Sequence, residues 1–256
     1  MLTFEKIGYY GRLGNQMFQY AALVGFAEKS GLDYGIPYRN QNKLDVGDYT
    51  ISLDLTNYFN LSCKDSSFVL PKKALIEDEN LTEPVEVPDE TTLHGYFQSE
   101  NFFLDVEDKI RDEFDFNKET RNTARPLVPE GVLVSLHVRR TDYTKFSHVH
   151  TNLGMDYYKE AMQYFDGYRP VVFSDDVEWC KNEMSWLGDD AVYMNNDAGV
   201  DMLLMSYCNG HIIANSSFSW WGSYLGQGKT IAPKKWYAEQ GPKDWQSIYR
   251  KDWIVL

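Results

Sequence analysis

VLVSLHV, residues 132–138, is an apolar run with the length and composition of a buried β-strand. Similar runs return later in the chain, at 171–173, 191–194, 211–214 and 229–232. Segments with the 3.6-residue period of helices separate them, at 156–165, 177–186, 200–208 and 217–225. Strands that alternate with helices at this spacing predict right-handed βαβ crossovers and a parallel sheet. Ligands of such sheets bind beyond the carboxyl ends of the strands.

The beginning of the chain shows a related pattern. Residues 4–9 predict a strand, and glycines in the next positions predict a loop before a helix that starts near Asn15. Gly31 has the character of a residue that ends this helix. A short strand is predicted at 34–36, and the polar stretch 39–90 predicts no particular element.

A further helix is predicted from Ser99 onward. Its apolar stripe is Phe102, Val106, Ile110 and Phe114. The polar stretch that follows, 117–130, contains two prolines that disfavour helix. The sequence therefore predicts an α/β fold with two domains, 1–125 and 126–256.

Composition excludes several classes of function. The formal net charge of −13 gives the chain the wrong sign to attract nucleic acid or an anionic membrane surface. Three cysteines without CxxC spacing suggest neither a disulfide framework nor a zinc site. The N-terminal residues lack a signal pattern, and the sequence has no apolar run of bilayer-spanning length. We therefore expect a cytoplasmic protein without stable membrane insertion.

A basic cluster, HVRRTD at 137–142, closes the strand 132–138. Arg139 and Arg140 can offer guanidinium forks to a diphosphate, and Asp142 can orient or neutralise one of them. His137 precedes them within the strand. The alternative is a surface ion-pair network. The position at a strand end favours the functional interpretation.

Two aspartates, Asp175 and Asp176, follow the strand 171–173. Their carboxylates can accept hydrogen bonds from guanine, bind a metal, or cap the next helix. Capping is the commonest role of such a pair. A metal site is disfavoured because no His or Cys lies nearby in the sequence.

A serine-rich segment, ANSSFSWWG at 214–222, runs from a strand end into a helix start. Hydroxyl groups and unpaired backbone N–H groups at a helix N-terminus suit a phosphate, and the helix dipole adds a positive end. For Trp220 and Trp221 we expect core packing rather than sugar stacking.

The glycine loop, GYYGRLGNQ at 8–16, is neither a GxGxxG fingerprint nor a Walker loop. Its glycines allow a ligand close to the backbone, and Arg12 and Asn15 supply donors. The alternative is a plain turn before a helix. The sequence also lacks G-x-S-x-G, so a serine hydrolase is not indicated.

Four motifs together resemble the bacterial α-1,2-fucosyltransferase family: GRLGNQMFQYA at 11–21, HVRRTDY at 137–143, FSDD at 173–176 and IIANSSFSWWG at 212–222. The resemblance spans nearly the whole chain. It implies a GT-B-like fold of two Rossmann-like α/β domains, GDP-fucose as donor, inversion at the sugar carbon, and no metal or other cofactor. The implied acceptor is a galactose-terminated oligosaccharide, and we expect its selector within 39–90.

The resemblance also implies roles for single residues. Arg139 is the implied ligand of the β-phosphate, with Arg12 and Asn15 as further catalytic residues facing the transferred sugar. The implied substrate-binding residues are Gly14, His137, Arg140, Asp142, Asp175, Asp176, Asn215, Ser216, Ser217 and Phe218. Either aspartate of the FSDD motif is implied as the guanine reader. Thr141 departs from the family, which commonly has glycine there, and a β-branched residue disfavours positive φ.

Rival functions predict other features. A nucleotide-sugar dehydrogenase or epimerase predicts GxGxxG after a strand, which this sequence lacks. A non-catalytic glycan-binding module predicts sugar binding that is independent of GDP. A fucosyltransferase of another linkage specificity shares the donor-binding features.

Overall fold

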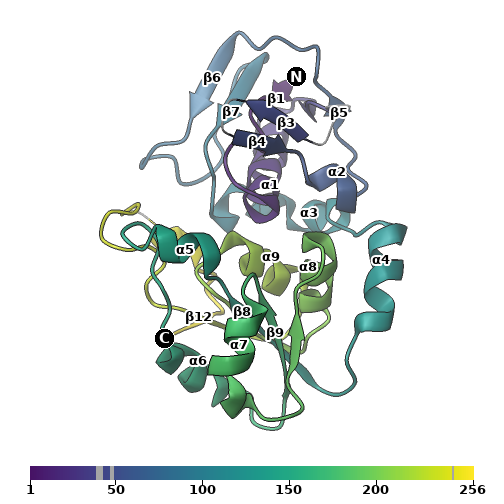
Figure 1. The fold of residues 1–256 in the computed structure, drawn as a ribbon. Coiled ribbons are helices and arrows are strands. Elements are labelled where there is room, and N and C mark those ends of the chain that lie inside the picture. Colours follow the sequence, from purple (N-terminus) through teal and green to yellow (C-terminus); the bar gives the residue numbers. More distant parts are fainter. Residues whose placement is uncertain (39–42, 47–48, 244) are drawn as a thin grey trace. The chain divides into compact units, whose positions relative to one another are not determined.

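The computed structural model describes residues 1–38, 43–46, 49–243 and 245–256 (Figure 1), and the side chains outside 39–52 and 244. The chain forms two compact units. The first comprises Met1–Asn117 and Gln246–Ile248, and the second comprises Lys118–Trp245 and Tyr249–Leu256.

The boundary between the units lies at 117/118 rather than at the expected 125/126. Helix α4 (Lys118–Ala124) occupies the stretch where the prolines disfavoured helix, because Pro126 follows the helix instead of interrupting it. Thr120 and Ala124 form a buried face of α4, which packs against α8 (Ala198–Ser206) of the second unit. This packing assigns α4 to the second unit.

The first unit contains a five-stranded, wholly parallel sheet with the order β5-β2-β1-β7-β6. Its strands are β1 (Leu2–Thr3), β2 (Tyr34–Ile36), β5 (Lys64–Asp65), β6 (Lys73–Ile76) and β7 (Thr91–His94). An antiparallel pair, β3 (Lys43–Val46) and β4 (Tyr49–Ser52), and the short helix α2 (Leu55–Tyr58) complete the stretch that the sequence left unassigned. Residues 39–42 and 47–48 of the expected acceptor selector lie outside the described residues.

Helix α1 (Leu13–Ser30) is the core of the first unit and is buried over most of its length. It ends as expected at Gly31, which adopts φ 62°. The N–H of Gly31 donates to Glu28 O (3.2 Å) and that of Leu32 donates to Ala27 O (3.0 Å). These two bonds form a Schellman motif, whose left-handed residue favours glycine.

Two local predictions in the first unit are wrong. Residues 4–9 form turns rather than a strand, since the N–H of Ile7 donates to Phe4 O (3.2 Å), and the side chains of both residues are buried. The strand β1 precedes them. The predicted helix from Ser99 is broken into η1 (Glu100–Phe102), η2 (Leu104–Val106) and α3 (Glu107–Glu113). At the break Phe103 has φ −144° and ψ 13°, which is not helical, and its side chain is buried. The expected apolar stripe is nevertheless buried as predicted.

The second unit contains a six-stranded parallel sheet with the order β10-β9-β8-β11-β12-β13. The strands are β8 (Leu133–Val138), β9 (Arg169–Ser174), β10 (Val192–Met194), β11 (Gly210–Ile212), β12 (Lys229–Ala232) and β13 (Ile254–Val255). Numbered along this unit the order is 3-2-1-4-5-6, which is that of doubly wound nucleotide-binding domains. The parallel sheet and five of its strands confirm the sequence prediction, whereas β13 was not expected.

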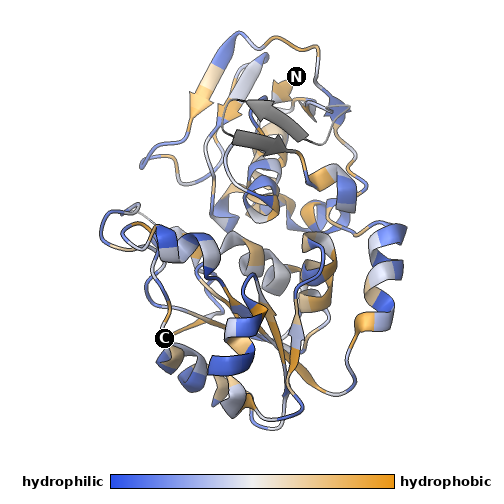
Figure 2. Cartoon of the chain, in the orientation of Figure 1, coloured by the Kyte–Doolittle hydropathy of each residue, from blue (hydrophilic) through white to orange (hydrophobic). Residues whose placement is uncertain are grey.

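The connecting helices of this unit are α5 (Thr141–Lys145), α6 (Met155–Met162), α7 (Val177–Glu183), α8 and α9 (Ser217–Leu225). Side chains of α6 and α7 join those of β8, β9, β11 and β12 in one hydrophobic cluster. Helices α8 and α9 pack against each other. Figure 2 shows the apolar strands of this sheet and the mixed polar and apolar helices around them.

Within the described residues, no helix is long and apolar enough to span a bilayer. The three cysteines, Cys63, Cys180 and Cys208, are buried free thiols.

The contact at Gly25 supplies a test of the first unit. A Cβ on this residue of α1 would lie 1.9 Å from Phe102 O. Because backbone must shift to relieve this clash, we expect Gly25→Ala to lower the free energy of unfolding by about 1–3 kcal/mol in calorimetry. Gly154→Ala is the control, since its Cβ would meet nothing within 4 Å. Equal stability of the two variants would contradict the described contact between α1 and η1.

Candidate functional site

The strand order of the second unit reverses between β8 and β11, which are parallel neighbours. Ligands of doubly wound sheets bind at such a switch point, beyond the carboxyl ends of the strands. Residues 139–142, here called the arginine turn, follow β8, and residues 215–218, here called the serine turn, follow β11. The topology therefore brings two of the predicted clusters to the same edge of the sheet.

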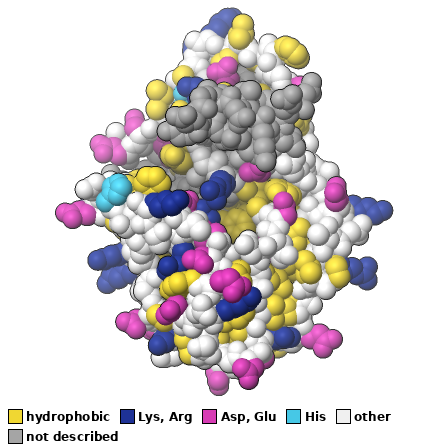
Figure 3. Space-filling model, in the orientation of Figure 1, with side chains coloured by type: hydrophobic (Ala, Val, Ile, Leu, Met, Phe, Trp, Pro, Cys, Tyr) yellow, Lys and Arg dark blue, Asp and Glu magenta, His cyan; other side chains and the backbone are white. Residues whose placement is uncertain are grey.

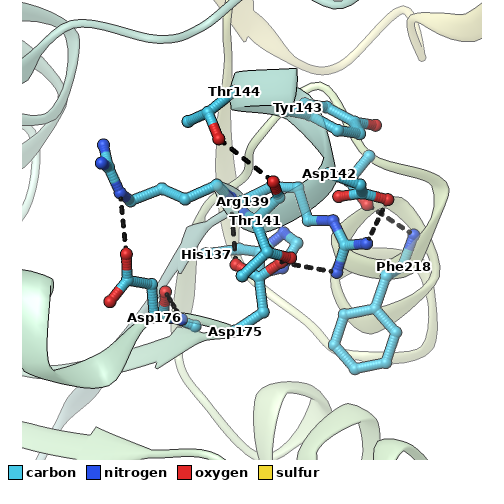
Figure 4. A network of polar contacts seen from close by, with 12 residues as sticks. His137, Arg139, Thr141, Asp142, Tyr143, Thr144, Asp175, Asp176 and Phe218 are labelled. Atoms are coloured by element: carbon cyan, nitrogen blue, oxygen red, sulfur yellow. Dashed lines mark hydrogen bonds and ion pairs between the residues drawn. The ribbon is translucent and has the colours of Figure 1, made fainter. Parts of the chain in front are cut away.

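Arg139 lies between two carboxylates (Figure 4). Its Nη2 donates to Asp142 Oδ2 at 2.7 Å, and its Nη1 lies 3.0 Å from Asp175 Oδ2. The side chain of Arg139 is 16% exposed, and its guanidinium lies 5.7 Å from the ring centroid of Tyr143. Asp142 is therefore an arginine partner, as the sequence predicted.

Asp175 also holds the backbone of the arginine turn. Its carboxylate accepts from the N–H of Arg140 (3.0 Å), the N–H of Thr141 (3.3 Å) and the hydroxyl of Thr141 (2.5 Å). Thr141 begins α5, so its backbone is helical and the family's glycine is not needed for positive φ. A guanine would compete with these partners for Asp175, and the role of guanine reader stays a prediction.

Arg140 has different partners from Arg139. Its Nε donates to Asp176 Oδ2 (3.2 Å), and its guanidinium lies 3.7 Å from the ring centroid of Trp179. Asp176 also caps α7, because its carboxylate accepts from Trp179 N (3.3 Å). Helix capping was the role that the sequence favoured for such an aspartate. Arg140 thus binds the start of α7. That Arg140 helps Arg139 to bind a phosphate stays a prediction.

The serine turn is anchored from several sides. The side-chain amide of Asn215 donates to the carbonyls of Thr151 (3.0 Å) and Trp236 (2.7 Å), so it shapes the turn from the protein interior. Ser216 caps α9 by accepting from Phe218 N (3.3 Å). Ser217 and Phe218 are half-buried at the N-terminus of α9, where N–H groups point outward and favour an anion.

Tyr143 joins the two turns and was missed by the sequence analysis. Its hydroxyl donates to Asn215 O at 2.9 Å, its ring stacks on His150 at 4.1 Å and 7°, and Arg139 lies over it. The sequence signal that could have indicated Tyr143 is its position four residues after Arg139, at the end of the HVRRTDY motif. Trp179 was also missed, although it follows the two aspartates.

His137 is buried beneath the site. Its Nδ1 lies 2.8 Å from Ser219 Oγ, and its ring lies 5.4 Å from that of Phe218. Burial, with the nearby Arg139 guanidinium, lowers the pKa of His137 to about 3. The imidazole is therefore neutral at pH 7, and its expected contact with a nucleotide stays a prediction.

Trp220 and Trp221 are fully buried, which confirms their predicted core packing. They contact each other and Tyr224 within the same helix.

The remaining predicted residues belong to the first unit. Arg12 is exposed at the start of α1, and Gly14 is buried in the first turn of that helix. Asn15 Oδ1 accepts from Gln98 Nε2 at 2.8 Å. Gly11, with φ 92°, lets the side chain of Asn15 fold over it, because a Cβ there would lie 1.9 Å from Asn15 Nδ2.

The charged side chains of the site are held in ion pairs with one another. Two arginines and three aspartates, Asp142, Asp175 and Asp176, leave the cluster with a formal charge of −1. Figure 3 shows acidic and basic side chains interspersed on this face of the molecule. Within the described residues, no group of three His, Cys, Asp or Glu side chains is arranged to hold a metal ion.

Comparison with known proteins identifies the chain's family. The model of the family described as Glycosyl transferase family 11 matches residues 3–256. The chain belongs to glycosyl transferase family 11. It is therefore a glycosyltransferase, and the resemblance found in its motifs is confirmed.

Relatives of this family 11 member include three transferases of named activity or pathway. It is 33% identical to an α-1,2-colitosyltransferase of Escherichia coli, over 90% of this chain and 91% of that protein. It is 30% identical to the O-antigen biosynthesis glycosyltransferase WbnK of Escherichia coli, over 89% and 93%. It is 27% identical to galactoside α-(1,2)-fucosyltransferase 1 of Mus musculus, over 86% and 63%.

Solved structures confirm the predicted GT-B-like fold class of this glycosyltransferase. The fucosyltransferase NodZ from Bradyrhizobium matches with a TM-score of 0.57 at 13% identity, covering 86% of this chain and 91% of that one. POFUT1 in complex with GDP-fucose matches with a TM-score of 0.57 at 11% identity, covering 90% and 96%.

The buried imidazole of His137 makes stability depend on pH. Its pKa lies below the usual value of 6.5 in the folded state, so the unfolded chain binds the proton first as the pH falls. The stabilising contribution is complete above pH 6.5 and is lost progressively toward pH 3, by at most about 1.4 kcal/mol per pH unit. We therefore expect the free energy of unfolding to fall between pH 7.5 and 5.5.

Tryptophan fluorescence during urea unfolding measures this effect, because all 7 tryptophans lie in the second unit. His137→Asn removes the His137 titration and should make the pH dependence shallower, while His211, whose burial lowers its pKa to about 4, keeps its own contribution. His148→Asn, at an exposed position, should leave it unchanged. Identical slopes for wild type and His137→Asn would show that His137 is not held neutral by burial.

Proposed function

We propose that this glycosyltransferase moves fucose from GDP-fucose to the 2-hydroxyl of a galactose-type acceptor, with inversion at the sugar carbon and without a metal ion. The observation that carries the proposal is the meeting of the arginine turn and the serine turn at the switch point of the second unit. Relatives with α-1,2-transferase activity support the linkage, and the POFUT1 complex with GDP-fucose supports the donor.

Arg139 has donors to spare for a diphosphate. A guanidinium carries five N–H donors, and contacts to Asp142 and Asp175 engage its two terminal nitrogens, each of which carries a second hydrogen. The aspartates hold the guanidinium in one orientation before the donor arrives. Backbone N–H groups at the start of α9 supply further donors. Phosphate binding then rests on directed hydrogen bonds rather than on the field of a cluster with charge −1.

In the proposed reaction the acceptor hydroxyl attacks the anomeric carbon of fucose as the bond to the β-phosphate oxygen breaks. The oxygen–carbon bond forms on the opposite face, which inverts the configuration, and GDP leaves with the bonding electrons. Arg139 and the N-terminus of α9 stabilise the charge that develops on GDP. The hydroxyl proton passes to solvent or to a carboxylate. Asp142 is held by Arg139, which makes it a poor base.

The relationship to the colitosyltransferase supports a second candidate donor. Colitose is fucose without its 3-hydroxyl group, so the same phosphate and guanine contacts would serve both GDP-sugars. The two differ by one hydrogen-bonding group on the transferred sugar. A site that hydrogen-bonds this hydroxyl would strongly reject the deoxy donor, whereas an apolar site would discriminate weakly.

We further propose a cytoplasmic enzyme that serves the synthesis of a surface oligosaccharide or lipopolysaccharide. The role of WbnK in O-antigen biosynthesis supports this assignment. Buried free thiols suit a reducing compartment. The proposal includes peripheral attachment to the inner face of the membrane.

Product analysis tests the proposed function. The enzyme is incubated with GDP-fucose or GDP-colitose and a panel of galactosides, in buffer with EDTA, and the linkage of each product is determined. We expect a fucosyl α-1,2-galactoside at the same rate with and without EDTA. Another linkage, a product formed only from GDP-colitose, or a requirement for added divalent metal would each overturn the corresponding part of the proposal.

Arg139→Ala tests the proposed phosphate contact. We expect kcat with GDP-fucose to fall by ~10²-fold or more, because the half-buried guanidinium no longer stabilises the leaving group. Arg140→Ala should cost less, since its guanidinium lies on Trp179 and Asp176. Arg125→Ala, at an exposed position of the same unit, is the control. Near-normal kcat for Arg139→Ala in a folded enzyme would refute the assignment.

A further inference from the structure

Two exposed tyrosines lie side by side on the first unit, outside the arginine turn and the serine turn of the second unit. Tyr10 is 40% exposed and Tyr96 is 45% exposed, and their ring centroids are 6.1 Å apart at an angle of 58°. Tyr10 belongs to the loop after β1, and Tyr96 follows β7. Because β1 and β7 are parallel neighbours, both tyrosines stand at the carboxyl edge of this sheet, where ligands of α/β units bind.

A buried glutamine fixes the two tyrosine-bearing segments to each other. Gln19 lies within α1 and is fully buried. Its Nε2 donates to the backbone carbonyl of Tyr10 (3.3 Å) and to that of Gly95 (3.0 Å). One amide group therefore uses its two donors to join the loop after β1 to the segment after β7. Gln19 therefore holds the two backbone segments that carry the tyrosines together from inside the protein.

Glu77 also fixes the backbone of Tyr96. Its carboxylate accepts from the N–H of Tyr96 (2.6 Å) and from that of Phe97 (2.9 Å). Phe97 adopts φ 51°, a left-handed conformation that costs a non-glycine residue about 1 kcal/mol or more. The cost is offset because the Phe97 ring is buried between Phe4 and Phe26. This backbone turns Phe97 inward and Tyr96 outward.

We propose that Tyr10 and Tyr96 form a stacking platform for the pyranose ring of the acceptor sugar. The proposal rests on the proposed function and adds the residues that receive the acceptor. Tyrosine suits a sugar because its ring packs against C–H groups while its hydroxyl stays hydrated or bonds to a sugar hydroxyl. Two rings inclined at 58° form a corner that contacts a pyranose on two sides. Arg12 and Asn15, in the same loop and helix start, offer polar partners for the sugar edge.

Substitutions test the platform through the acceptor KM. The enzyme is assayed with the galactoside of the panel that has the highest kcat/KM, at saturating GDP-fucose. We expect Tyr96→Ala and Tyr10→Ala each to raise the acceptor KM about three- to tenfold, and the double variant to raise it further. The KM for GDP-fucose should stay within about twofold of the wild-type value, because an isolated aromatic contact to the acceptor does not bind the nucleotide.

Two further variants separate stacking from other effects. Tyr96→Phe keeps the ring and should retain the wild-type acceptor KM within about twofold. Tyr207→Ala removes a tyrosine of equal exposure (40%) from the second unit and should change neither KM. A rise with Tyr96→Phe equal to that with Tyr96→Ala would assign the effect to the hydroxyl and overturn stacking.

Different results of these experiments would contradict the tyrosine platform and the proposed function. An unchanged acceptor KM in the Tyr10→Ala, Tyr96→Ala double variant, with fucosyl transfer intact, would overturn the platform alone. A wild-type enzyme that forms no fucosyl product with any galactoside would overturn the proposed function, and the platform with it. Loss of GDP binding in the tyrosine variants would show that the rings serve the donor, which also contradicts the platform.

Discussion

The contact that organises the carboxyl edge of the second unit's sheet is the one between Asp175 and the arginine turn. Strands β8 and β9 pair in a register that sets Val138 opposite Ser174. The residue after each strand therefore meets the residue after the other, and Asp175 reaches the backbone of Arg140 and Thr141 as well as the guanidinium of Arg139. A carboxylate with this many donors fixes the direction of Arg139 and the start of α5. Through α5 it also places Tyr143 against the serine turn.

This arrangement makes preorganisation the main electrostatic feature of the site. Three carboxylates outnumber two guanidinium groups, so the proposed phosphate would gain little from the long-range field. In the proposed complex it would gain instead from N–H donors whose directions the aspartates and the N-terminus of α9 already set. The buried His137 fits the same pattern, because a neutral imidazole supports the turn without adding a charge that would need solvation.

The first unit uses buried polar groups in a comparable way. Gln19 donates to backbone carbonyls in the segments that follow β1 and β7, and Glu77 accepts from two backbone N–H groups in the segment that follows β7. Burial raises the pKa of Glu77, while its two backbone donors favour the ionised form. The left-handed backbone of Phe97 persists because its ring is locked in the core. In both units, therefore, side chains inside the protein determine what the carboxyl edge of the sheet presents.

The sequence by itself determined the alternation of strands and helices after residue 132, the bounds of α9 and the C-terminal end of α1, and the burial of Trp220 and Trp221. These are local properties, since hydrophobic period, capping residues and glycine conformation act within a few turns. Its four motifs also determined the family. The short strand β13 and the broken helix after Ser99 escaped prediction, because neighbours distant in the sequence decide them. Only the tertiary structure decided that Arg139 meets Asp175 while Arg140 turns to Trp179, and that Tyr10 meets Tyr96. Strand order and register bring those residues together, and no local pattern encodes which strand end will be the neighbour of another.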